Sequence, residues 1–303
     1  MKTTIDPSSI VVATDGSDDA HRAVHWAAEQ AYLERRPLAV VTAIGTPGVP
    51  AIAWAGMGAA YAYQPHELVE YGRVVADQAL ALVRRLRPGL RAEATVLTGD
   101  PRQALVDLSS NVHLLVLGSR GRGAFRSKVL GSVSAAVSRD ASCPVIVCRP
   151  VSSDRTPDQG VLVGADGTPE SLPVIEFAFH QASLLGLPLT VVHCVGPEIG
   201  VAAGVVGESS PARSWEEHRL LLSESVAGMS TKFPEVDVDL RLASGIAEVY
   251  LARNTGAWNL VVVGRHPVDT VFQFLTGAVA TAVVERAHTT VAVVPQSEPR
   301  PES

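Results

Sequence analysis

Cysteine, aromatic residues and excess positive charge are all scarce in this sequence of 303 residues. Its three cysteines, Cys143, Cys148 and Cys194, are too few and too odd in number for a disulfide scaffold, and they favour a reducing compartment. Aromatic residues make up only 5% of the chain, and its net charge is −6. We therefore do not expect aromatic surfaces that stack the bases of single-stranded nucleic acid, or non-specific binding of nucleic-acid phosphates.

Long uninterrupted hydrophobic runs are also missing. Residues 37–64 contain no charge, but proline and glycine break this stretch, and its unbroken remainder, 51–63, is too short to cross a bilayer. Residues 1–7 contain no apolar segment typical of a secretory signal. We expect a cytoplasmic protein that associates with neither a membrane nor nucleic acid.

What the chain does contain is an internal repeat. The segment IVVATDGS, which holds Asp15, matches VLVGADGT, which holds Asp166, at an offset of 151 residues. Later matches, such as Gly131 with Gly277, have an offset of 146, so the second copy lacks five residues, and the length-variable region after the second strand is the expected place. Two domains are predicted, residues 1–150 and 151–303, joined by the polar segment 149–160.

Each copy alternates short β-branched apolar runs with helical patterns, which is typical of βαβ units and a parallel sheet. In the first copy we predict strands near 9–14, 38–44, 93–97, 113–118 and 144–148, and helices near 18–35, 66–87, 101–110 and 130–140. Ser17 and Pro101 suit the first turns of two helices, and the tail after Pro295 is expected to fray. The predicted fold class is α/β, with two tandem five-stranded parallel sheets in three-layer α/β/α domains.

The segment from Gly118 to Ser132 is the most informative. It reads G-x2-G-x9-G-S, follows an apolar strand and precedes a helical pattern. Glycine lets a backbone approach a phosphate, and successive N–H groups at a helix N-terminus attract an anion. The spacing matches neither a Walker A loop nor a dinucleotide fingerprint. The residues alone therefore indicate an anion site, with charge added by four cations: Arg120, Arg122, Arg126 and Lys128.

Asp15 ends the first strand, at the sheet edge where open α/β folds bind ligands. Taken alone, it is better explained as a cap of the helix that starts near Ser17. With the glycine loop on the same edge, we interpret its carboxylate as a ligand-binding group suited to ribose hydroxyls or an adenine amino group.

With these residues the sequence resembles the universal stress protein family, in its tandem two-domain form, over nearly the whole chain. The resemblance rests on the strand-Asp-Gly starts at Asp15 and Asp166, the glycine pattern over 118–132, and the segment Cys143-Pro-Val. It implies an α/β fold that binds ATP in many members, and we expect Mg²⁺ with it. It also implies that Asp15 contacts adenine or ribose, that Ala43 lines the adenine pocket, and that the ribose and phosphates are held by Gly118, Gly121, Gly131, Ser132 and Val133, with charge from Arg120 and Arg122.

The second copy keeps Asp166, Gly264 and Gly277 as a weaker version of this site. It departs where Pro267 replaces Gly121 and Ala278 replaces Ser132. Proline has no N–H and alanine no hydroxyl, and each lost hydrogen bond to a charged group costs about 1.5–3 kcal/mol. We expect a competent first site and a weak or empty second one.

Three functions stay open on this sequence: an ATP-binding stress-response regulator acting through conformation or partners, a slow ATPase or self-phosphorylating protein, and a nucleotide-independent scaffold. We find no Walker B pattern and no evident base, so no enzyme, catalytic residue or metal ligand is predicted. The resemblance implies a pseudo-twofold pairing of the two domains through residues 145–147 and 291–293. A further homodimer is also expected.

Other features are given structural interpretations. His21 and His25 stand four apart on a helix without a third ligand, which favours a solvated face. His193 and Cys194 end a strand and are predicted to be buried and satisfied rather than redox-active. A lid, an interface and a loose surface loop all remain open for the aromatic-rich segment that holds Trp54, Met57, Tyr61 and Tyr63.

Overall fold

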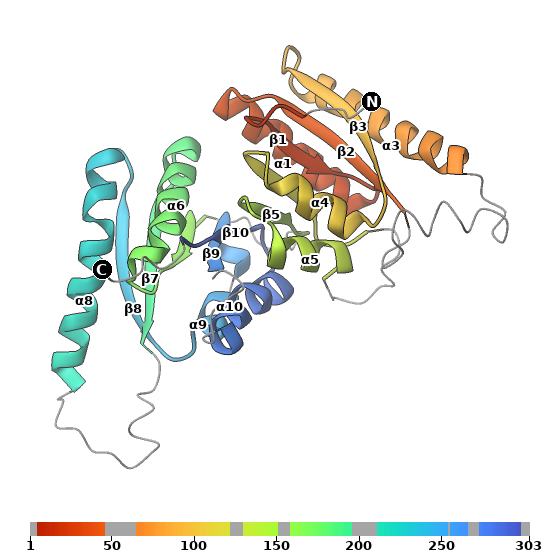
Figure 1. Ribbon diagram of the computed structural model, residues 1–303. Coiled ribbons are helices and arrows are strands. Elements are labelled where there is room, and N and C mark those ends of the chain that lie inside the picture. Colours follow the sequence, from red (N-terminus) through yellow and green to blue (C-terminus); the bar gives the residue numbers. More distant parts are fainter. Residues whose placement is uncertain are drawn as a thin grey trace, which may run out of the picture. The chain divides into compact units, whose positions relative to one another are not determined.

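A computed structural model describes residues 5–45, 65–121, 130–150, 158–195, 211–253, 255–265 and 273–297 (Figure 1). The chain divides into two compact units, residues 1–150 and 151–303. Each unit has a parallel sheet with helices on both faces, so the predicted α/β class with two tandem domains is confirmed.

The sheet of the first unit has the order β3-β2-β1-β4-β5, with every described pairing parallel. Its strands are β1 (Ile10–Ala13), β2 (Leu38–Ile44), β3 (Ala92–Thr98), β4 (Leu114–Gly118) and β5 (Val145–Cys148). β1 lies at the centre, with Ile10 in register with both Leu38 and Leu114. The chain first winds outward from β1 to β3 and then restarts at β4, so β1 and β4 flank the point where strand order reverses. Ligands of open α/β sheets bind at this point.

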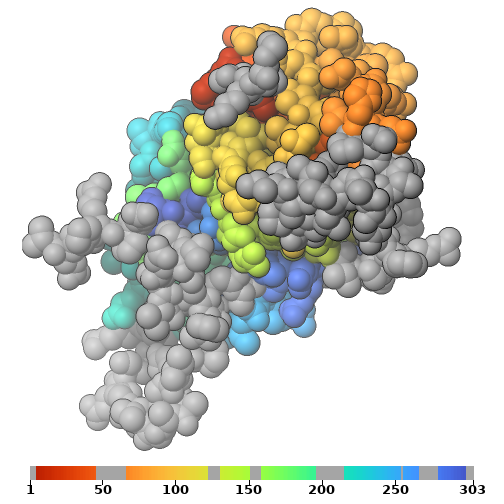
Figure 2. All heavy atoms as spheres, turned by 45° about the vertical axis from the view of Figure 1, so that its right-hand side comes forward, coloured from red at the N-terminus to blue at the C-terminus, as the bar shows by residue number. Residues whose placement is uncertain are grey.

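Four helices of the described residues cover this sheet, with α1 (Asp18–Glu34) against α3 (Pro65–Leu86) and α4 (Pro101–Ser109) against α5 (Ser132–Asp140). Local signals explain where they begin. The Ser17 hydroxyl caps α1 by accepting from the N–H of Ala20, and Asp100 caps α4 ahead of Pro101. The orange outer face of α3 lies at the surface in Figure 2. In this helix Tyr71 is 47% exposed, whereas Val83 is fully buried.

The second unit repeats this topology in the order β10-β9-β6-β7-β8. Its strands are β6 (Val161–Gly164), β7 (Leu189–Val195), β8 (Val238–Ser244), β9 (Leu260–Arg265) and β10 (Val291–Pro295). Its helices are α6 (Leu172–Leu185), α8 (Pro211–Lys232), α9 (Ala247–Ala252) and α10 (Gln273–Arg286). A short 3-10 turn, Pro169–Ser171, precedes α6, because Pro173 suits only the first turn of the α-helix that follows.

The elements locate the five missing residues. The offset is still 151 between β2 and β7, and it is already 146 between α3 and α8. The shortening therefore falls between the end of the second strand and the next helix of the repeat, within residues 45–64 of the first copy and 196–210 of the second. This agrees with the predicted length-variable region.

Several predictions lie outside the described residues, namely those on the aromatic-rich segment (Trp54, Met57, Tyr61, Tyr63), on the cations Arg122, Arg126 and Lys128, and on Pro267. The pairing of the two units through 145–147 and 291–293 and the homodimer stay predictions. No helix in the described part of the chain is long and apolar enough to span a membrane.

Candidate functional site

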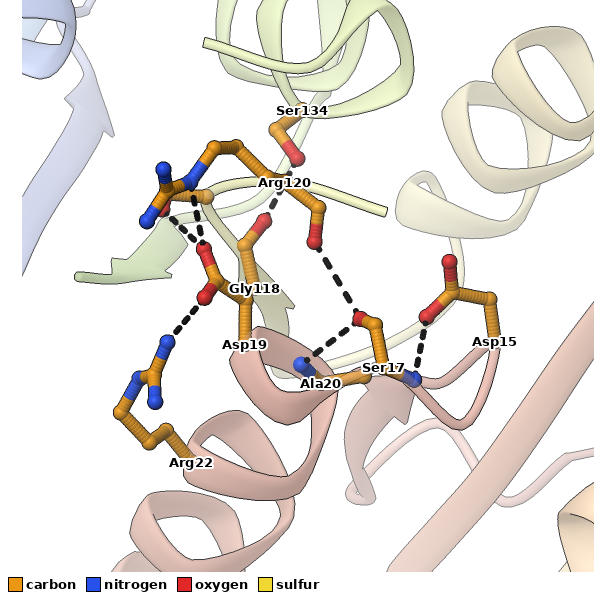
Figure 3. Close-up of polar contacts among 9 residues, drawn as sticks. Asp15, Ser17, Asp19, Ala20, Arg22, Gly118, Arg120 and Ser134 are labelled. Atoms are coloured by element: carbon orange, nitrogen blue, oxygen red, sulfur yellow. Dashed lines mark hydrogen bonds and ion pairs between the residues drawn. The ribbon is translucent and has the colours of Figure 1, made fainter. Parts of the chain in front are cut away.

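The first unit gathers its predicted site residues at the carboxyl end of the sheet. Asp15 follows β1, and Gly118 ends the adjacent β4. Gly121 lies against Asp15, because a Cβ built on this glycine would be 2.6 Å from Asp15 Oδ2. Gly131 and Ser132 begin α5, the helix after β4. A Cβ built on Gly131 would be 3.7 Å from the nitrogen of Gly121, so the start of α5, Gly121 and the strand-end carboxylate form one cluster. Figure 3 shows Asp15 and Gly118 of this cluster.

The Asp15 carboxylate has two roles in this cluster. Its Oδ1 accepts a hydrogen bond from the backbone N–H of Ser17 at 3.0 Å and closes the turn before α1. Ser17, rather than Asp15, is the cap of α1, since its hydroxyl accepts from the N–H of Ala20 at 3.3 Å. The other oxygen of Asp15 lies beside the backbone of Gly121. One oxygen is thus structural, and the other faces the glycine loop.

Gly118 is required for packing. A Cβ there would lie 2.6 Å from the carbonyl carbon of Asp19 and 2.8 Å from the nitrogen of Ala20, both in the backbone of α1. Any side chain at this position would push the end of β4 away from the first turn of α1. This glycine therefore brings the loop and the N-terminus of α1 together, a role that the sequence pattern alone did not separate from phosphate binding.

Donors of the protein take up the carbonyl oxygens at the start of the loop. The Ser134 hydroxyl donates to the carbonyl of Gly118 at 2.7 Å, and the N–H of Gly131 donates to Ser119 at 2.8 Å. The Ser17 hydroxyl lies 3.3 Å from the carbonyl oxygen of Arg120 (Figure 3). These contacts hold the segment to both α1 and α5 and engage oxygens that would repel an anion.

The N-terminus of α5 lacks a side-chain cap. Gly131 occupies the N-cap position with φ −66° and ψ 147°, and no side chain accepts from the first turn. The first N–H groups of a helix have no intrahelical partner and carry partial positive charge. Ser132 is exposed and Val133 half-buried, so their N–H groups and the Ser132 hydroxyl are placed to receive an anion.

An acidic residue that the sequence analysis missed stands behind this loop. The Asp19 side chain is only 8% exposed, and it pairs with Arg22 and with Arg120, whose Nε lies 3.2 Å from Oδ2. The Ser119 hydroxyl donates to the same oxygen at 2.5 Å. Arg120 was expected at the ligand, which stays a prediction, and its guanidinium is paired with Asp19 (Figure 3). The signal in the sequence was an acidic pair at the start of a helix, but Ser119 and Arg120 lie about 100 positions from Asp19.

Burial alone would raise the pKa of Asp19. The hydrogen bond from Ser119 and the charges of Arg22 and Arg120 outweigh burial and hold its pKa below the usual value. Asp19 is therefore ionised at neutral pH, and it joins α1 to the segment after β4.

The remaining first-unit predictions concern Ala43 and the metal. Ala43 is half-buried near the carboxyl end of β2, on the same edge of the sheet. The described residues contain no group of three His, Cys, Asp or Glu side chains that could hold a metal ion. Mg²⁺ usually binds through substrate phosphates, water and one or two carboxylates, and Asp15 supplies a carboxylate in this cluster.

The second unit places Asp166 and Gly264 in the lining of one cavity of about 170 Å³. Asp166 Oδ1 accepts from the N–H and the hydroxyl of Thr168, at 2.9 and 2.8 Å. Its Oδ2 accepts from the side-chain amide of Gln296 at 3.1 Å. Gly277 lies in the first turns of α10. Gln296 was missed because it follows the last strand, in the tail that was expected to fray.

The histidines follow their structural interpretations, whereas Cys194, which was predicted to be buried with His193, is only half-buried. His21 and His25 are exposed on α1, as predicted. All three cysteines are thiols outside any disulfide bond, and burial raises the pKa of the Cys194 thiol to about 11, which keeps it protonated at neutral pH. His193 is buried and hydrogen-bonded, with Nδ1 2.9 Å from the carbonyl of Ala165.

Comparison with known proteins agrees with this architecture. The model of the universal stress protein family matches residues 8–149 and again 159–295. A universal stress protein of Mycolicibacterium smegmatis is 31% identical over 297 residues, covering 94% of this chain and 96% of that protein. The crystal structure of a universal stress protein from Archaeoglobus fulgidus has a TM-score of 0.67 at 19% identity, covering 96% of this chain and 99% of that one. A universal stress protein crystallised with cAMP is 24% identical, with a TM-score of 0.36 over 46% of this chain and 95% of that one. The chain belongs to the universal stress protein family and carries two of its domains in tandem.

Proposed function

We propose that the first unit is an ATP-binding regulatory module, with its nucleotide held between Asp15 and the N-terminus of α5. The observation that carries this proposal is the uncapped first turn of α5 in the same cluster as the strand-end carboxylate. The two groups offer opposite charge to one ligand. A nucleotide matches this arrangement because its phosphates are anionic and its ribose and base carry hydrogen-bond donors.

Each residue then has a definite task. The N–H groups of Ser132 and Val133 and the Ser132 hydroxyl bind phosphate oxygens. Asp15 Oδ2 accepts from a ribose hydroxyl or an adenine amino group, and Ala43 lines the base. Gly121 lets the backbone lie against Asp15, since a side chain there would fill the space beside the carboxylate.

We propose that the module binds ATP without efficient hydrolysis. Asp15 is the carboxylate of the cluster, and one of its oxygens already closes the turn through Ser17. Asp19 is occupied by its two arginines and Ser119. Neither is arranged as a base for water, so occupancy rather than turnover would carry the signal. A nucleotide bound here would tie α1, β4 and α5 together and so alter the conformation or the partners of the first unit.

The decisive measurement is the nucleotide content of the freshly purified chain, released by denaturation and separated by chromatography, with its stoichiometry. We expect about one ATP per chain. Ser132→Ala should weaken binding by about tenfold, the worth of one hydrogen bond to a charged group. Ser138→Ala on the same helix is the matched control, because that buried hydroxyl has no hydrogen-bond partner. No nucleotide on the purified chain, followed by no heat on titration with ATP and magnesium, would overturn the proposal in favour of a scaffold.

A further inference from the structure

Two adjoining cavities lie at the amino end of the second sheet, on the edge opposite Asp166. Their volumes are about 260 and 370 Å³, and both are lined by Gln159, Arg241 and Trp258. Gln159 comes just before β6 and Trp258 just before β9, which places the cavities where these strands begin. Small-molecule sites typically measure about 300–1,000 Å³. The larger of the two, which we call the amino-end cavity, is therefore large enough for a ligand.

The space exists because α9 covers less of its sheet than α4 does in the first unit. α4 has nine residues and packs on both β2 and β3, whereas α9 has six and, in the described part of the chain, packs mainly on β7 among the strands. At the position of Arg241 on β8 the first unit has Thr95 on β3. Thr95 is buried, whereas the side chain of Arg241 is 49% exposed. The second unit thus leaves open a part of the sheet that the first unit closes.

Four positions in the lining of the amino-end cavity differ together between the two copies. At the offset of 146 residues, the lining residues Arg241, Tyr250, Arg253 and Trp258 correspond to Thr95, Ala104, Asp107 and Val112. Two cations and two aromatic rings therefore stand where the first copy has a hydroxyl, an acid and two small apolar side chains. The four residues come from β8, from α9 and its end, and from the segment before β9, so no single helical or strand pattern accounts for the change.

The two arginines give the amino-end cavity its positive charge. Arg253 is exposed and forms no ion pair with any other residue that the structure describes. Arg241 pairs with Asp239, with 2.6 Å between Nε and Oδ2. Because this pair engages Nε, the two terminal nitrogens of Arg241 remain available as donors. The described residues that line the amino-end cavity include no Asp or Glu, so one negative charge is favoured there.

The aromatic side of the cavity is held in place by backbone hydrogen bonds. The N–H of Trp258 donates to Thr255 at 3.1 Å, and the Trp258 carbonyl accepts from the Thr289 hydroxyl at 2.8 Å. The N–H of Gln159 donates to Ala257 at 3.1 Å. Trp258 is 7% exposed and lies at the base of the cavity, whereas Tyr250, on α9, is 37% exposed. Two aromatic rings on either side of a fixed space suit a flat apolar ring.

The smaller cavity limits how much negative charge the site accepts. Its lining includes the carboxylates of Asp237 and Asp239 beside Arg241. Taken together, the described linings of the two cavities hold two arginines and two aspartates. A ligand with a single negative charge at the Arg253 end is attracted, whereas a nucleoside triphosphate would place several negative charges near the two aspartates.

We propose that the amino-end cavity of the second unit binds a small aromatic carboxylate. The carboxylate pairs with the Arg253 guanidinium and accepts from the terminal nitrogens of Arg241, and the ring packs between Tyr250 and Trp258. An apolar cavity of about 150 Å³ holds one benzene ring, so about 370 Å³ has room for a fused ring system. This inference goes beyond the proposed function, because it uses no residue of the first unit and none at the carboxyl end of the second sheet.

The test titrates the full chain with three probes, by calorimetry and by ligand-observed NMR at low salt. Indole-3-acetate carries both the ring and the charge, indole-3-acetamide keeps the ring without the charge, and acetate keeps the charge without the ring. We expect indole-3-acetate to bind and the other two to bind at least about tenfold more weakly, because each lacks one of the two contacts. The same results are expected in the presence of saturating ATP and magnesium.

Two variants of Arg253 locate the bound carboxylate. Arg253→Gln should weaken binding of indole-3-acetate by about tenfold and leave indole-3-acetamide unchanged. Arg253→Asp, which introduces the residue type of the first copy, should weaken indole-3-acetate further. Arg219→Gln is the matched control, since Arg219 is an exposed arginine on α8 outside the described linings of both cavities. Thermal unfolding of each variant shows whether the chain is folded.

Several outcomes would contradict the inference. They are no binding of indole-3-acetate at millimolar concentration, equal binding of the amide, displacement by ATP, and binding that neither Arg253 variant weakens. Failure of the proposed function is distinguishable from these. In that case the chain binds no ATP, while binding of indole-3-acetate still depends on Arg253.

Discussion

Gly121→Ala is the sharpest test of the first-unit site, because the clash it creates involves a single side chain. The new Cβ would lie 2.6 Å from Asp15 Oδ2, where ordinary contact begins at 3.4 Å, and its next neighbour is the carboxyl carbon of Asp15 at 3.6 Å. The backbone φ of Gly121 is not in the left-handed region. The variant therefore has one way to relieve the clash, which is to displace the Asp15 carboxylate.

The expected magnitude follows from the bonds that this displacement breaks. The hydrogen bond from the N–H of Ser17 to Asp15 Oδ1, at 3.0 Å, is weakened, which costs about 1 kcal/mol of stability. The contact of Oδ2 with the nucleotide is lost as well. A hydrogen bond to a charged group is worth about 1.5–3 kcal/mol, so the Kd for ATP should rise by about 10- to 150-fold.

Calorimetric titration with ATP and magnesium measures this change, with thermal unfolding of the same samples as a check of the fold. Gly228→Ala is the matched control, since its Cβ would meet nothing within 4 Å. In an Asp15→Ala background Gly121→Ala should cost nothing further, because the clash no longer exists. An unchanged Kd in the single variant, or an equal loss with and without the Asp15 side chain, would refute the assignment.

Three further predictions concern stability and reactivity. Asp19→Asn should lower the free energy of unfolding by about 1–3 kcal/mol at pH 7. Because the folded-state pKa of Asp19 is lowered, its stabilisation is present above the unfolded pKa of about 3.9 and is lost as the pH falls through the folded value. The free energies of unfolding of the two proteins, measured with urea, should therefore converge in acid. A difference that stays constant with pH would contradict the ion-pair account. Gly228→Ala, exposed within α8, should raise the free energy of unfolding by about 0.5–1 kcal/mol, and a decrease would show an unseen contact. With a pKa of about 11, the Cys194 thiol should react with iodoacetamide far more slowly at pH 7.5 than a small-molecule thiol, and complete labelling within minutes would show that its pKa is not raised.

The fold was predictable because its signals are local. The predicted strand and helix boundaries of the first unit lie within about two residues of those observed, since β-branched runs and caps such as Ser17 are read from neighbouring residues. The helix predicted from residue 130 begins instead at Ser132, because Gly131 adopts the extended conformation of an N-cap. The internal repeat then predicts the second unit, since a strand or helix boundary in one copy locates the corresponding boundary in the other.

The site was predictable only in part, because its most informative contacts join distant positions. Asp15 and the three glycines were found from their places after strands. Asp19 was not found, since its buried partner Ser119 is remote in sequence. In addition, an acidic residue in the first turn of a helix is already explained by the helix dipole, without any distant partner. The pairing of His193 with His218 was similarly hidden, because only the packing of α8 on β7 brings their rings to a centroid distance of 4.9 Å.

The two aspartates show why a retained motif does not by itself indicate a retained ligand. Gly16 and Gly167 have φ angles of 77° and 80°, and each follows an aspartate that accepts from the N–H two residues on, Ser17 or Thr168. The Asp-Gly-Ser/Thr segment is therefore first a turn, and it would be kept in a copy that binds nothing.

What separates the copies is the second carboxylate oxygen. In the first unit it lies beside the backbone of Gly121, next to the uncapped helix, and in the second it accepts from Gln296. Asp166 is thus explained by its turn and its glutamine without any nucleotide. Gln296 and His193 have no counterpart of the same kind in the first unit, where the corresponding positions hold Pro150 and Thr42.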